Sequence, residues 1–337
     1  MTGHAVFVSG ASGFLGSRVV PELLASGNRV RGLARSERAA AVIAALGAEP
    51  IAGDLADLEA MTDAMKGCDL VLHLAARFRE GGSPAAYYRD NVVGTEQMLA
   101  AAQAAGVRRF VMVGAAMCLL GNGPIENADE SWPLGEPRFS SYARTKTIAD
   151  RTVLRANRDG FTTCVVRPAW VWGPGDPQGE AVVEAARKGQ MRLIDGGVYP
   201  IVTSHIENTV RGVTLALERG RGGEAYYVFD DGLTPIGDFI GQILAASGLA
   251  KPTNAIPRKV AWVVGSLMDA AWTLLRRQGE PPVSRLLVAL NGGPFLVSDA
   301  KARRELGYSP VISRKDGFAR LTEHIRGAPS ALPASAG

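Results

Sequence analysis

The sequence predicts an α/β protein with a doubly wound parallel sheet and a smaller, mostly helical C-terminal lobe. Over the first half of the chain, short apolar segments alternate with segments that have helical spacing. These apolar segments lack the polar alternation of half-exposed strands, which favours a parallel sheet covered by helices on both faces. A glycine-rich loop joins the first strand to the first helix. A length of 337 residues leaves room for a second unit beside the sheet.

The individual elements follow from local composition. Leu15, Val19 and Leu23 share one face of the first helix, and glycines end several of the helices. The strands are short runs rich in β-branched or aromatic residues. We expect strands at 4–9, 29–33, 50–52, 69–74, 109–113 and 162–166, and helices at 14–26, 37–46, 58–66, 91–105 and 142–157.

The alternation weakens after Pro168, where a turn-rich segment follows. Helix and strand signals return at 180–229, and the remainder is mainly helical. We therefore expect a first domain at 1–173 with a contribution from about 201–229, and a lobe at 174–200 and 230–326. Residues 327–337 have Leu332 as their one large apolar residue, so a disordered tail is expected.

Composition and charge exclude several classes of protein. Hydrophobic residues make up 47% and charged residues 21% of the chain, so extensive disorder and fibrous structure are excluded. The net charge of +4 comes from scattered basic residues, which argues against a nucleic-acid surface and suits a small anionic ligand. Cys68, Cys118 and Cys164 are far apart, so we expect buried thiols in a reducing cytosol and neither disulfides nor a metal site.

The longest apolar segment is 260–275, which contains Asp269. It is shorter than the roughly 20 residues of a membrane-spanning helix. We interpret it as a buried or interface helix, with docking on a membrane surface as the alternative. The N-terminus has no cationic region before its apolar run, so we expect a cytoplasmic protein rather than a secreted one.

The glycine-rich loop is typical of a dinucleotide site because it follows a strand and begins a helix. Glycines allow a tight turn and a close approach to a pyrophosphate, and the helix N-terminus offers free N–H groups. The alternative is a turn without ligand. The expected contacts are Gly10, Ser12, Gly13, Phe14, Leu15 and Gly16.

The end of the second strand bears on the choice of cofactor. A carboxylate about 20 residues after the glycine loop would bind a ribose 2′-hydroxyl. This chain has Arg35, Ser36 and Arg38 there, which could bind a 2′-phosphate, although Glu37 lies between them. We therefore expect NADP(H) rather than NAD(H), the alternative being a solvated basic loop.

Tyr142 and Lys146 are four residues apart on an expected helix and therefore share a face. An ammonium group near a phenol lowers the pKa of the phenol by stabilising phenolate. Such a tyrosine can exchange a proton with a carbonyl or alcohol oxygen near neutral pH. The pair is therefore a candidate acid/base, and it lies downstream of a nucleotide-binding loop.

With these motifs the chain resembles the extended short-chain dehydrogenase/reductases of the NAD(P)-dependent epimerase/dehydratase group, which have a Rossmann fold. The segments GASGFLG, GDLAD, HLAA, NVVGT, YARTK and RPAWVWGPGD carry the resemblance, in that order, between 10 and 176. SHIEN at 204–208 and KARRELGYSP at 301–310 resemble the 3β-hydroxysteroid dehydrogenase and dihydroflavonol-reductase-like branch.

The resemblance implies roles for particular residues. It makes Tyr142 the catalytic acid/base, and it makes Lys146 a ligand of the nicotinamide ribose. Asn91 would brace the central helix, although a helix-start cap is an equal alternative. His205 would be structural or line the substrate cleft rather than act in catalysis. Further cofactor contacts are implied for Asp54 and Leu55 at the adenine, Ala75 and Ala76 along the channel, and Pro168 at the nicotinamide.

One position departs from the family pattern. A Ser or Thr normally follows the fifth strand and bonds the reacting oxygen, but here the sequence is Gly114-Ala115-Ala116. Loss of one such donor costs about 10²–10³ in rate. Three explanations are open. Another group supplies the hydrogen bond, or the natural reaction requires less stabilisation of the reacting oxygen, or the activity is weak. Ser140 and Ser141 are near Tyr142 in sequence, but their directions cannot be read from it.

These observations predict an NADP(H)-dependent oxidoreductase that interconverts a ketone and a secondary alcohol on a hydrophobic, sterol-like or polyketide- or flavonoid-like small molecule. The alternatives are a nucleotide-sugar epimerase or dehydratase, for which Arg187, Arg192, Arg276 and Arg277 could supply cations, and an NADP(H)-binding sensor or scaffold. A homodimer is a further possibility. The apolar side chains expected in the substrate lobe are Trp170, Trp172, Trp262, Met268, Trp272 and Phe295.

Overall fold

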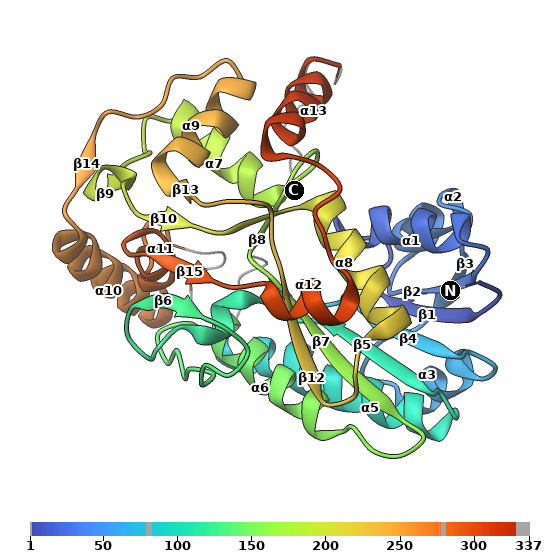
Figure 1. Cartoon of the computed structure of the whole chain (residues 1–337). Helices are drawn as coiled ribbons and strands as arrows, with labels where there is room; N and C mark the ends of the chain where they lie inside the picture. The colour runs from blue at the N-terminus through green and yellow to red at the C-terminus, as the bar shows by residue number, and fades with distance from the viewer. Residues whose placement is uncertain (1, 79–82, 276, 278–280, 328–337) are drawn as a thin grey trace.

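The computed structural model describes residues 2–78, 83–275, 277 and 281–327. Its centre is a seven-stranded, wholly parallel sheet in the order β12-β7-β5-β4-β1-β2-β3 (Figure 1). This order, with the chain turning outward in both directions from β1, confirms the doubly wound fold. The strands are β1 (Ala5–Ser9), β2 (Arg29–Ala34), β3 (Glu49–Ala52), β4 (Leu70–His73), β5 (Arg109–Val113), β7 (Thr162–Pro168) and β12 (Glu224–Val228).

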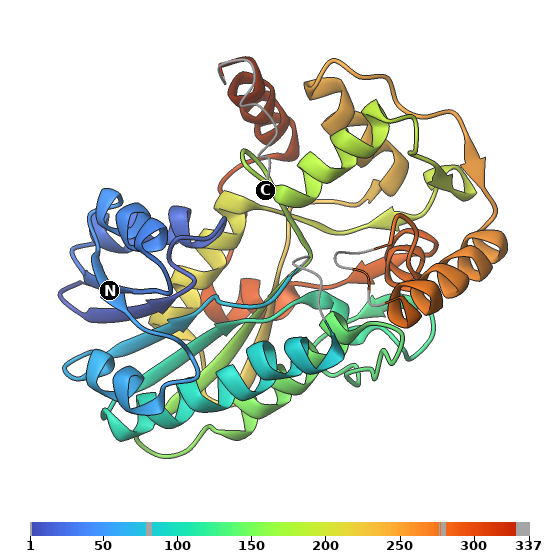
Figure 2. The ribbon, with the colours of Figure 1, turned by 180° about the vertical axis from the view of Figure 1, so that it is seen from behind.

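Helices cover both faces of this sheet, which is why β1 and β4 are buried at every residue. One face carries α3 (Leu58–Met65), α5 (Gly94–Ala104) and α6 (Ser141–Arg155), which run beneath the strands in Figure 2. The opposite face carries α1 (Gly16–Ala25) and α8 (Ile206–Arg219), and α12 (Ala300–Leu306) packs on α8. Helix α2 (Glu37–Ala45) follows β2 and contacts β2 and β3.

The second lobe holds a four-stranded sheet in the order β13-β10-β15-β6 and two strand pairs, β11 with β8 and β14 with β9. The strands are β6 (Ile125–Ala128), β8 (Trp170–Trp172), β9 (Leu193–Ile194), β10 (Pro200–Ile201), β11 (Thr203–His205), β13 (Thr234–Pro235), β14 (Ala255–Ile256) and β15 (Phe295–Val297). The helices are α7 (Pro177–Arg187), α9 (Ile236–Ala246), α10 (Arg258–Leu274), α11 (Arg285–Asn291) and α13 (Arg314–Gly327).

The helix expected at 91–105 begins earlier. Helix α4 (Pro84–Tyr88) leads through a π-helical turn, Arg89–Val93, into α5. The N-cap is Ser83, whose hydroxyl accepts from the N–H of Ala86. Asn91 is therefore not a helix-start cap. Residues 328–337 of the expected tail lie outside the described residues, and Gly327 ends α13.

The segment 260–275 forms most of α10. Of the two predicted environments, the structure contradicts a fully buried helix and does not test an interface helix. Ala261 and Gly265 are its buried residues, whereas Val263 and Leu267 are 59% and 67% exposed. Helical periodicity could not reveal this, because α10 is apolar on the outward as well as on the inward face. No helix among the described residues has both the length and the apolar content that crossing a membrane requires.

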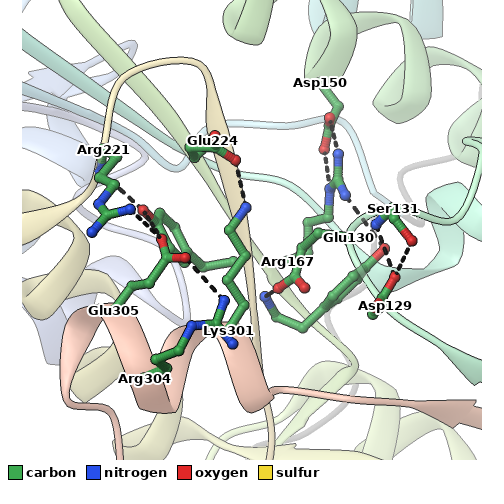
Figure 3. A network of polar contacts seen from close by, with 12 residues as sticks. Asp129, Glu130, Ser131, Asp150, Arg167, Arg221, Glu224, Lys301, Arg304 and Glu305 are labelled. Carbon is green, nitrogen blue, oxygen red and sulfur yellow. Dashed lines mark hydrogen bonds and ion pairs between the residues drawn. The ribbon is translucent and has the colours of Figure 1, made fainter.

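A buried ion pair joins α6 to β7. Two guanidinium nitrogens of Arg167 donate to the two carboxylate oxygens of Asp150 at 2.8 and 2.6 Å, and both side chains are nearly inaccessible (Figure 3). A third nitrogen lies 3.4 Å from the hydroxyl of Tyr227 on β12. A second network, in which Lys301 pairs with Glu224 at 2.5 Å and Glu305 with Arg304 at 3.0 Å, joins α12 to β12. Cys68, Cys118 and Cys164 are buried free thiols, as expected.

Candidate active site

A cavity of about 1030 Å³ lies where the carboxyl ends of the central strands meet the second lobe. The glycine loop and the ends of β2, β4, β5 and β7 contribute to its wall. Asp54 is the one predicted contact that the wall lacks. The predicted residues that do line it are Gly10, Ser12, Gly13, Phe14, Leu15, Gly16, Arg35, Ser36, Arg38, Leu55, Ala75, Ala76, Tyr142, Lys146 and Pro168.

The glycine loop forms a cradle, a concave stretch of backbone in which side chains at Gly10 or Gly16 would collide with neighbouring backbone atoms. Gly10 has φ +72°, and a Cβ there would lie 2.9 Å from the backbone N of Ala75. A Cβ at Gly16 would collide with the carbonyl oxygen of Gly10. The loop therefore packs closely against the backbone after β4 and leads directly into α1, whose first N–H groups have no partner within the helix. This geometry fits the pyrophosphate of a dinucleotide.

Arg35 and Arg38 are exposed at the cavity, just after β2. Neither forms an ion pair with any residue that the structure describes. The hydroxyl of Ser36 caps α2 by accepting from the N–H of Ala39 at 3.2 Å, and it retains its own proton for a ligand. Glu37 is exposed and does not line the cavity. These cations fit a phosphate better than a ribose hydroxyl.

Asp54 closes a local turn instead of lining the cavity. Its carboxylate accepts from the N–H of Ala56 at 2.9 Å. The neighbouring Leu55 does line the cavity and packs against Gly94 of α5.

Tyr142 and Lys146 lie in the first two turns of α6. The hydroxyl of Ser140 caps this helix by accepting from the N–H of Ala143 at 3.2 Å. The Tyr142 ring packs against Phe78 and Tyr87, with centroids 4.9 and 6.4 Å away. The ammonium of Lys146 donates to the carbonyl of Val113 at 2.8 Å, and its burial lowers its pKa to about 8.

The position of the missing hydroxyl is part of the cavity wall. Gly114, Ala115 and Ala116 all line the cavity directly after β5. A Cβ at Gly114 would lie 2.8 Å from the Val165 side chain and 3.1 Å from the Asp150 carboxylate, so this site excludes side chains. Ala115 has an extended backbone at the cavity wall. Ser140 and Ser141 do not line the cavity, so neither supplies the missing donor there.

A directed chain of hydrogen bonds fixes the backbone after β4. Thr95 donates to the carbonyl of Asn91 at 2.7 Å and so accepts from Nε2 of His73 at 3.0 Å. Nδ1 of His73 therefore accepts from the hydroxyl of Ser9 at 2.7 Å, and Ser9 accepts from the N–H of Ala75 at 3.3 Å. Burial lowers the pKa of His73 to about 3, which keeps the ring neutral.

The side chain of Asn91 clasps the same backbone. Its carbonyl oxygen accepts from the N–H of Arg77 at 2.6 Å, while its amide donates to Thr145 on α6 at 3.0 Å. Asn91 therefore braces the loop after β4 against the helix that carries Tyr142. Sequence reasoning missed two cavity residues beside it, Arg77 and Asp90, which pair at 2.7 Å. The sequence feature that could have indicated them is their position beside predicted motifs, since Arg77 follows HLAA and Asp90 precedes NVVGT.

The second lobe closes the cavity mainly with apolar groups. Trp170 and Phe295 line it as expected, together with Ile201, Ile236 and Leu290. Asp176 also lines it and accepts from the Trp170 indole at 2.8 Å and from two N–H groups of α7, while its burial raises its pKa to about 6. Other expected lobe side chains do not reach the cavity: Trp172, Trp262, Met268, Trp272, Arg187, Arg192 and Arg277. Arg276 lies outside the described residues.

Two other histidines, His205 and His4, lie away from the cavity wall. His205 is buried at the end of β11, where its Nδ1 accepts from the N–H of Glu207 and its ring packs on Trp172. It does not line the cavity. His4 precedes β1 and lies 3.5 Å from Asp69.

Comparison with known proteins identifies the family. The model of the NAD dependent epimerase/dehydratase family matches residues 6–229. A 4-hydroxy-2-methyl-3-oxo-4-farnesyl-3,4-dihydroquinoline-1-oxide ketoreductase of Stigmatella aurantiaca is 39% identical over 331 residues, which cover 97% of this chain and 98% of that protein. A 2-alkyl-3-oxoalkanoate reductase of Stenotrophomonas maltophilia is 35% identical, with 94% and 98% covered.

Two solved structures extend the comparison to the fold. The crystal structure of gox2253 matches with a TM-score of 0.77 and 28% identity, covering 96% of this chain and 98% of that one. The dTDP-glucose 4,6-dehydratase DesIV from Streptomyces venezuelae, solved as a double mutant with NAD and DAU bound, matches with a TM-score of 0.74 and 25% identity, with 96% and 97% covered. The chain therefore belongs to the NAD dependent epimerase/dehydratase family.

Proposed function

We propose that this protein is an NADP(H)-dependent oxidoreductase that interconverts a ketone and a secondary alcohol on a hydrophobic small molecule. The observation that carries the proposal is that one cavity brings Tyr142 and Lys146 together with a glycine cradle and an apolar wall. The full-length relatives named ketoreductase and 3-oxoalkanoate reductase support this class of reaction.

The nicotinamide, when bound, supplies or accepts the hydride at the carbonyl carbon. Tyr142 donates its phenolic proton to the carbonyl oxygen during reduction and takes one back during oxidation. Lys146 holds a positive charge that stabilises the phenolate and, as the family pattern implies, binds ribose hydroxyls. The Asn91 clasp and the His73 chain hold the backbone of the cofactor wall in place around them.

The apolar wall of the second lobe supports a hydrophobic substrate. Ile201, Leu290 and Phe295 offer no donors to a sugar, and the arginines that line the cavity (Arg35, Arg38 and Arg77) all come from the sheet domain. The relatives include sterol-4-α-carboxylate 3-dehydrogenases and a 3β-hydroxysteroid dehydrogenase/isomerase. A nucleotide sugar, whose pyrophosphate needs cations, fits this lobe less well.

The reaction class is tested by NADPH oxidation with a panel of hydrophobic ketones. In parallel, dTDP-glucose and UDP-glucose are incubated with the oxidised cofactor and their products are separated by chromatography, because epimerisation and dehydration consume no net cofactor. Tyr142→Phe is expected to lower kcat at least about 10²-fold, since it removes the acid, and to leave NADPH affinity nearly unchanged. Full activity of Tyr142→Phe on a confirmed ketone would contradict the acid/base role. Turnover of the sugars alone assigns the epimerase/dehydratase chemistry. Tight NADPH binding without any turnover assigns the sensor or scaffold.

Cofactor choice is tested at Arg35. Wild-type protein is expected to bind NADPH more tightly than NADH, because charged hydrogen bonds to the 2′-phosphate contribute about 1.5–3 kcal/mol each. Arg35→Asp is expected to reverse the preference by repelling the phosphate and accepting from a ribose hydroxyl. Fluorescence titration of both cofactors measures this. Equal affinities in the wild type would overturn the assignment. Arg29→Asp, at the start of β2 and outside the cavity wall, is the control.

A further inference from the structure

The outward face of α10 is apolar from end to end. Val260, Val263, Leu267 and Leu274 are 48%, 59%, 67% and 83% exposed, and their spacings of three, four and seven residues place them on one stripe. Leu275, at the C-cap, is 60% exposed and extends the stripe. Figures 1 and 2 both show α10 at the outer edge of the second lobe. Clustered exposed apolar groups of this kind mark an interaction surface.

The inward face of α10 is held tightly by small residues, so the helix is firmly attached. Ala261 is buried, and a Cβ at Gly265 would lie 3.0 Å from the backbone of Ser284, just before α11. Asp269 turns to this side as well, where its carboxylate accepts from Arg285 at 2.9 Å. Its charge is therefore neutralised away from the outward stripe.

Basic residues flank the stripe. Residues 258–285 contain five Lys or Arg (Arg258, Lys259, Arg276, Arg277, Arg285) and two acidic residues (Asp269, Glu280), a net charge of +3 out of +4 for the chain. Arg258, Lys259 and Arg277 are exposed at the two ends of α10. Arg277 lies over the Trp272 ring at 5.1 Å. An apolar stripe between cationic ends complements an anionic lipid surface.

We propose that α10 docks this protein on the surface of an anionic lipid bilayer, with the Val260–Leu274 stripe in the acyl boundary and its basic ends at the headgroups. At 17 residues α10 is about 26 Å long, which suits a helix that lies in the interface and does not cross it. A two-fold pairing of two copies through antiparallel α10 helices would instead bring Arg258 and Lys259 against the partner's Arg277, a repulsive arrangement.

The same element adjoins the cavity. Helix α11, which packs on α10, contributes Leu290 and Asn291 to the cavity wall. The Trp262 ring of α10 contacts Phe139, three residues before Tyr142, at 5.7 Å between centroids. Docking through α10 would therefore place the cavity close to the lipid. The docking itself is independent of the proposed reaction, so the test below needs no substrate.

Vesicle flotation of the purified full chain tests the proposal. Vesicles of phosphatidylcholine mixed with phosphatidylglycerol are compared with pure phosphatidylcholine, at low and high salt. We expect binding to the mixed vesicles, weakened by salt. Leu267→Glu is expected to lower the binding constant at least about tenfold, since it places a carboxylate in the apolar stripe. Lys259→Glu is expected to weaken binding to the mixed vesicles selectively.

Val198→Glu is the matched control, because Val198 is 64% exposed and lies outside α10. It is expected to bind vesicles like the wild type. Thermal melting and NADPH titration verify that each variant is folded. Absence of wild-type binding to the mixed vesicles, or equal loss in Val198→Glu, overturns the proposal. If light scattering shows a dimer that Leu267→Glu separates while vesicles bind neither protein, the stripe is an interface between two copies and the proposal is wrong.

Discussion

At the scale of single residues, the end of β5 shows how packing restricts the position of a catalytic donor. Gly114 is closed to side chains by Val165 and Asp150, so a hydroxyl can enter only at Ala115 or beyond. Ala115 faces the cavity from an extended backbone and is 9% exposed. A serine at position 115 would therefore place its hydroxyl at the cavity wall.

Ala115→Ser is expected to raise kcat for ketone reduction by about tenfold, less than the 10²–10³ of an optimised donor because the hydroxyl is not preorganised. Steady-state kinetics on the same ketone measure it. Gly114→Ser is the contrasting variant, expected to lower thermal stability because its Cβ meets Val165. An unchanged kcat in Ala115→Ser means that a different group already bonds the reacting oxygen.

Lys146 gives the site a pH dependence. Its pKa is lowered to about 8 by burial, against the attraction of Asp150, so its charge is present below pH 8 and lost above it. Because the ammonium supports the Tyr142 proton transfer, kcat/KM for reduction is expected to fall as pH rises through about 8. The Lys146→Arg variant stays charged at higher pH. It is expected to react more slowly, and the fall in its kcat/KM is expected to occur at a higher pH than in the wild type. If kcat/KM of Lys146→Arg still falls near pH 8, the titrating group is not Lys146.

At the scale of elements, the position of α6 is set by contacts in its first turns and at its middle. Its first turns are braced by Asn91 through Thr145, and its middle is anchored to β7 by the Asp150–Arg167 pair. Both side chains of the pair are at most 3% exposed. Burial disfavours the charged form of Arg167, but the attraction of Asp150 outweighs this effect, so the pKa of Arg167 is raised. The helix that carries Tyr142 and Lys146 is thereby fixed relative to the strand ends.

Asp150→Asn is expected to lower the free energy of unfolding by about 3–5 kcal/mol, because it leaves a buried guanidinium without its counter-charge. Urea unfolding measures it. The control is Asp238→Asn, which breaks the exposed pair with Lys251 and is expected to cost at most about 1 kcal/mol. Similar losses in the two variants would mean that the buried pair contributes no more than a surface pair.

At the scale of the whole molecule, the sequence predicted the sheet domain well and the second lobe poorly. The strands 4–9 and 109–113 match β1 and β5 closely, because a buried parallel strand is mostly apolar and local composition therefore specifies it. In the lobe, β10, β13 and β14 are two residues long and owe their conformation to tertiary pairing. No periodicity exists in so short a segment.

The candidate site, like the fold, was predicted from the sequence only in part. The predicted cofactor contacts follow motifs tied to backbone geometry, and 15 of these 16 residues line the cavity. Asp54 is the exception, since its side chain bonds its own turn. Phe78 and Asp90 were not predicted although they lie beside predicted motifs, and Leu290 was not predicted because it reaches the wall through the packing of α11.

The strand that completes the central sheet is synthesised only after the chain has passed from β7 into the second lobe and back. Strand β7 ends at Pro168, and β12, which covers its open edge, ends at Val228, 60 residues later. A ribosome that adds 5–20 residues per second needs about 3–12 s for this stretch. During that interval the nascent chain carries an apolar strand with one unpaired edge, the feature from which strand-to-strand aggregation begins. Overproduction at a temperature where translation outpaces chaperone supply is therefore the condition under which this chain is most exposed to misassembly.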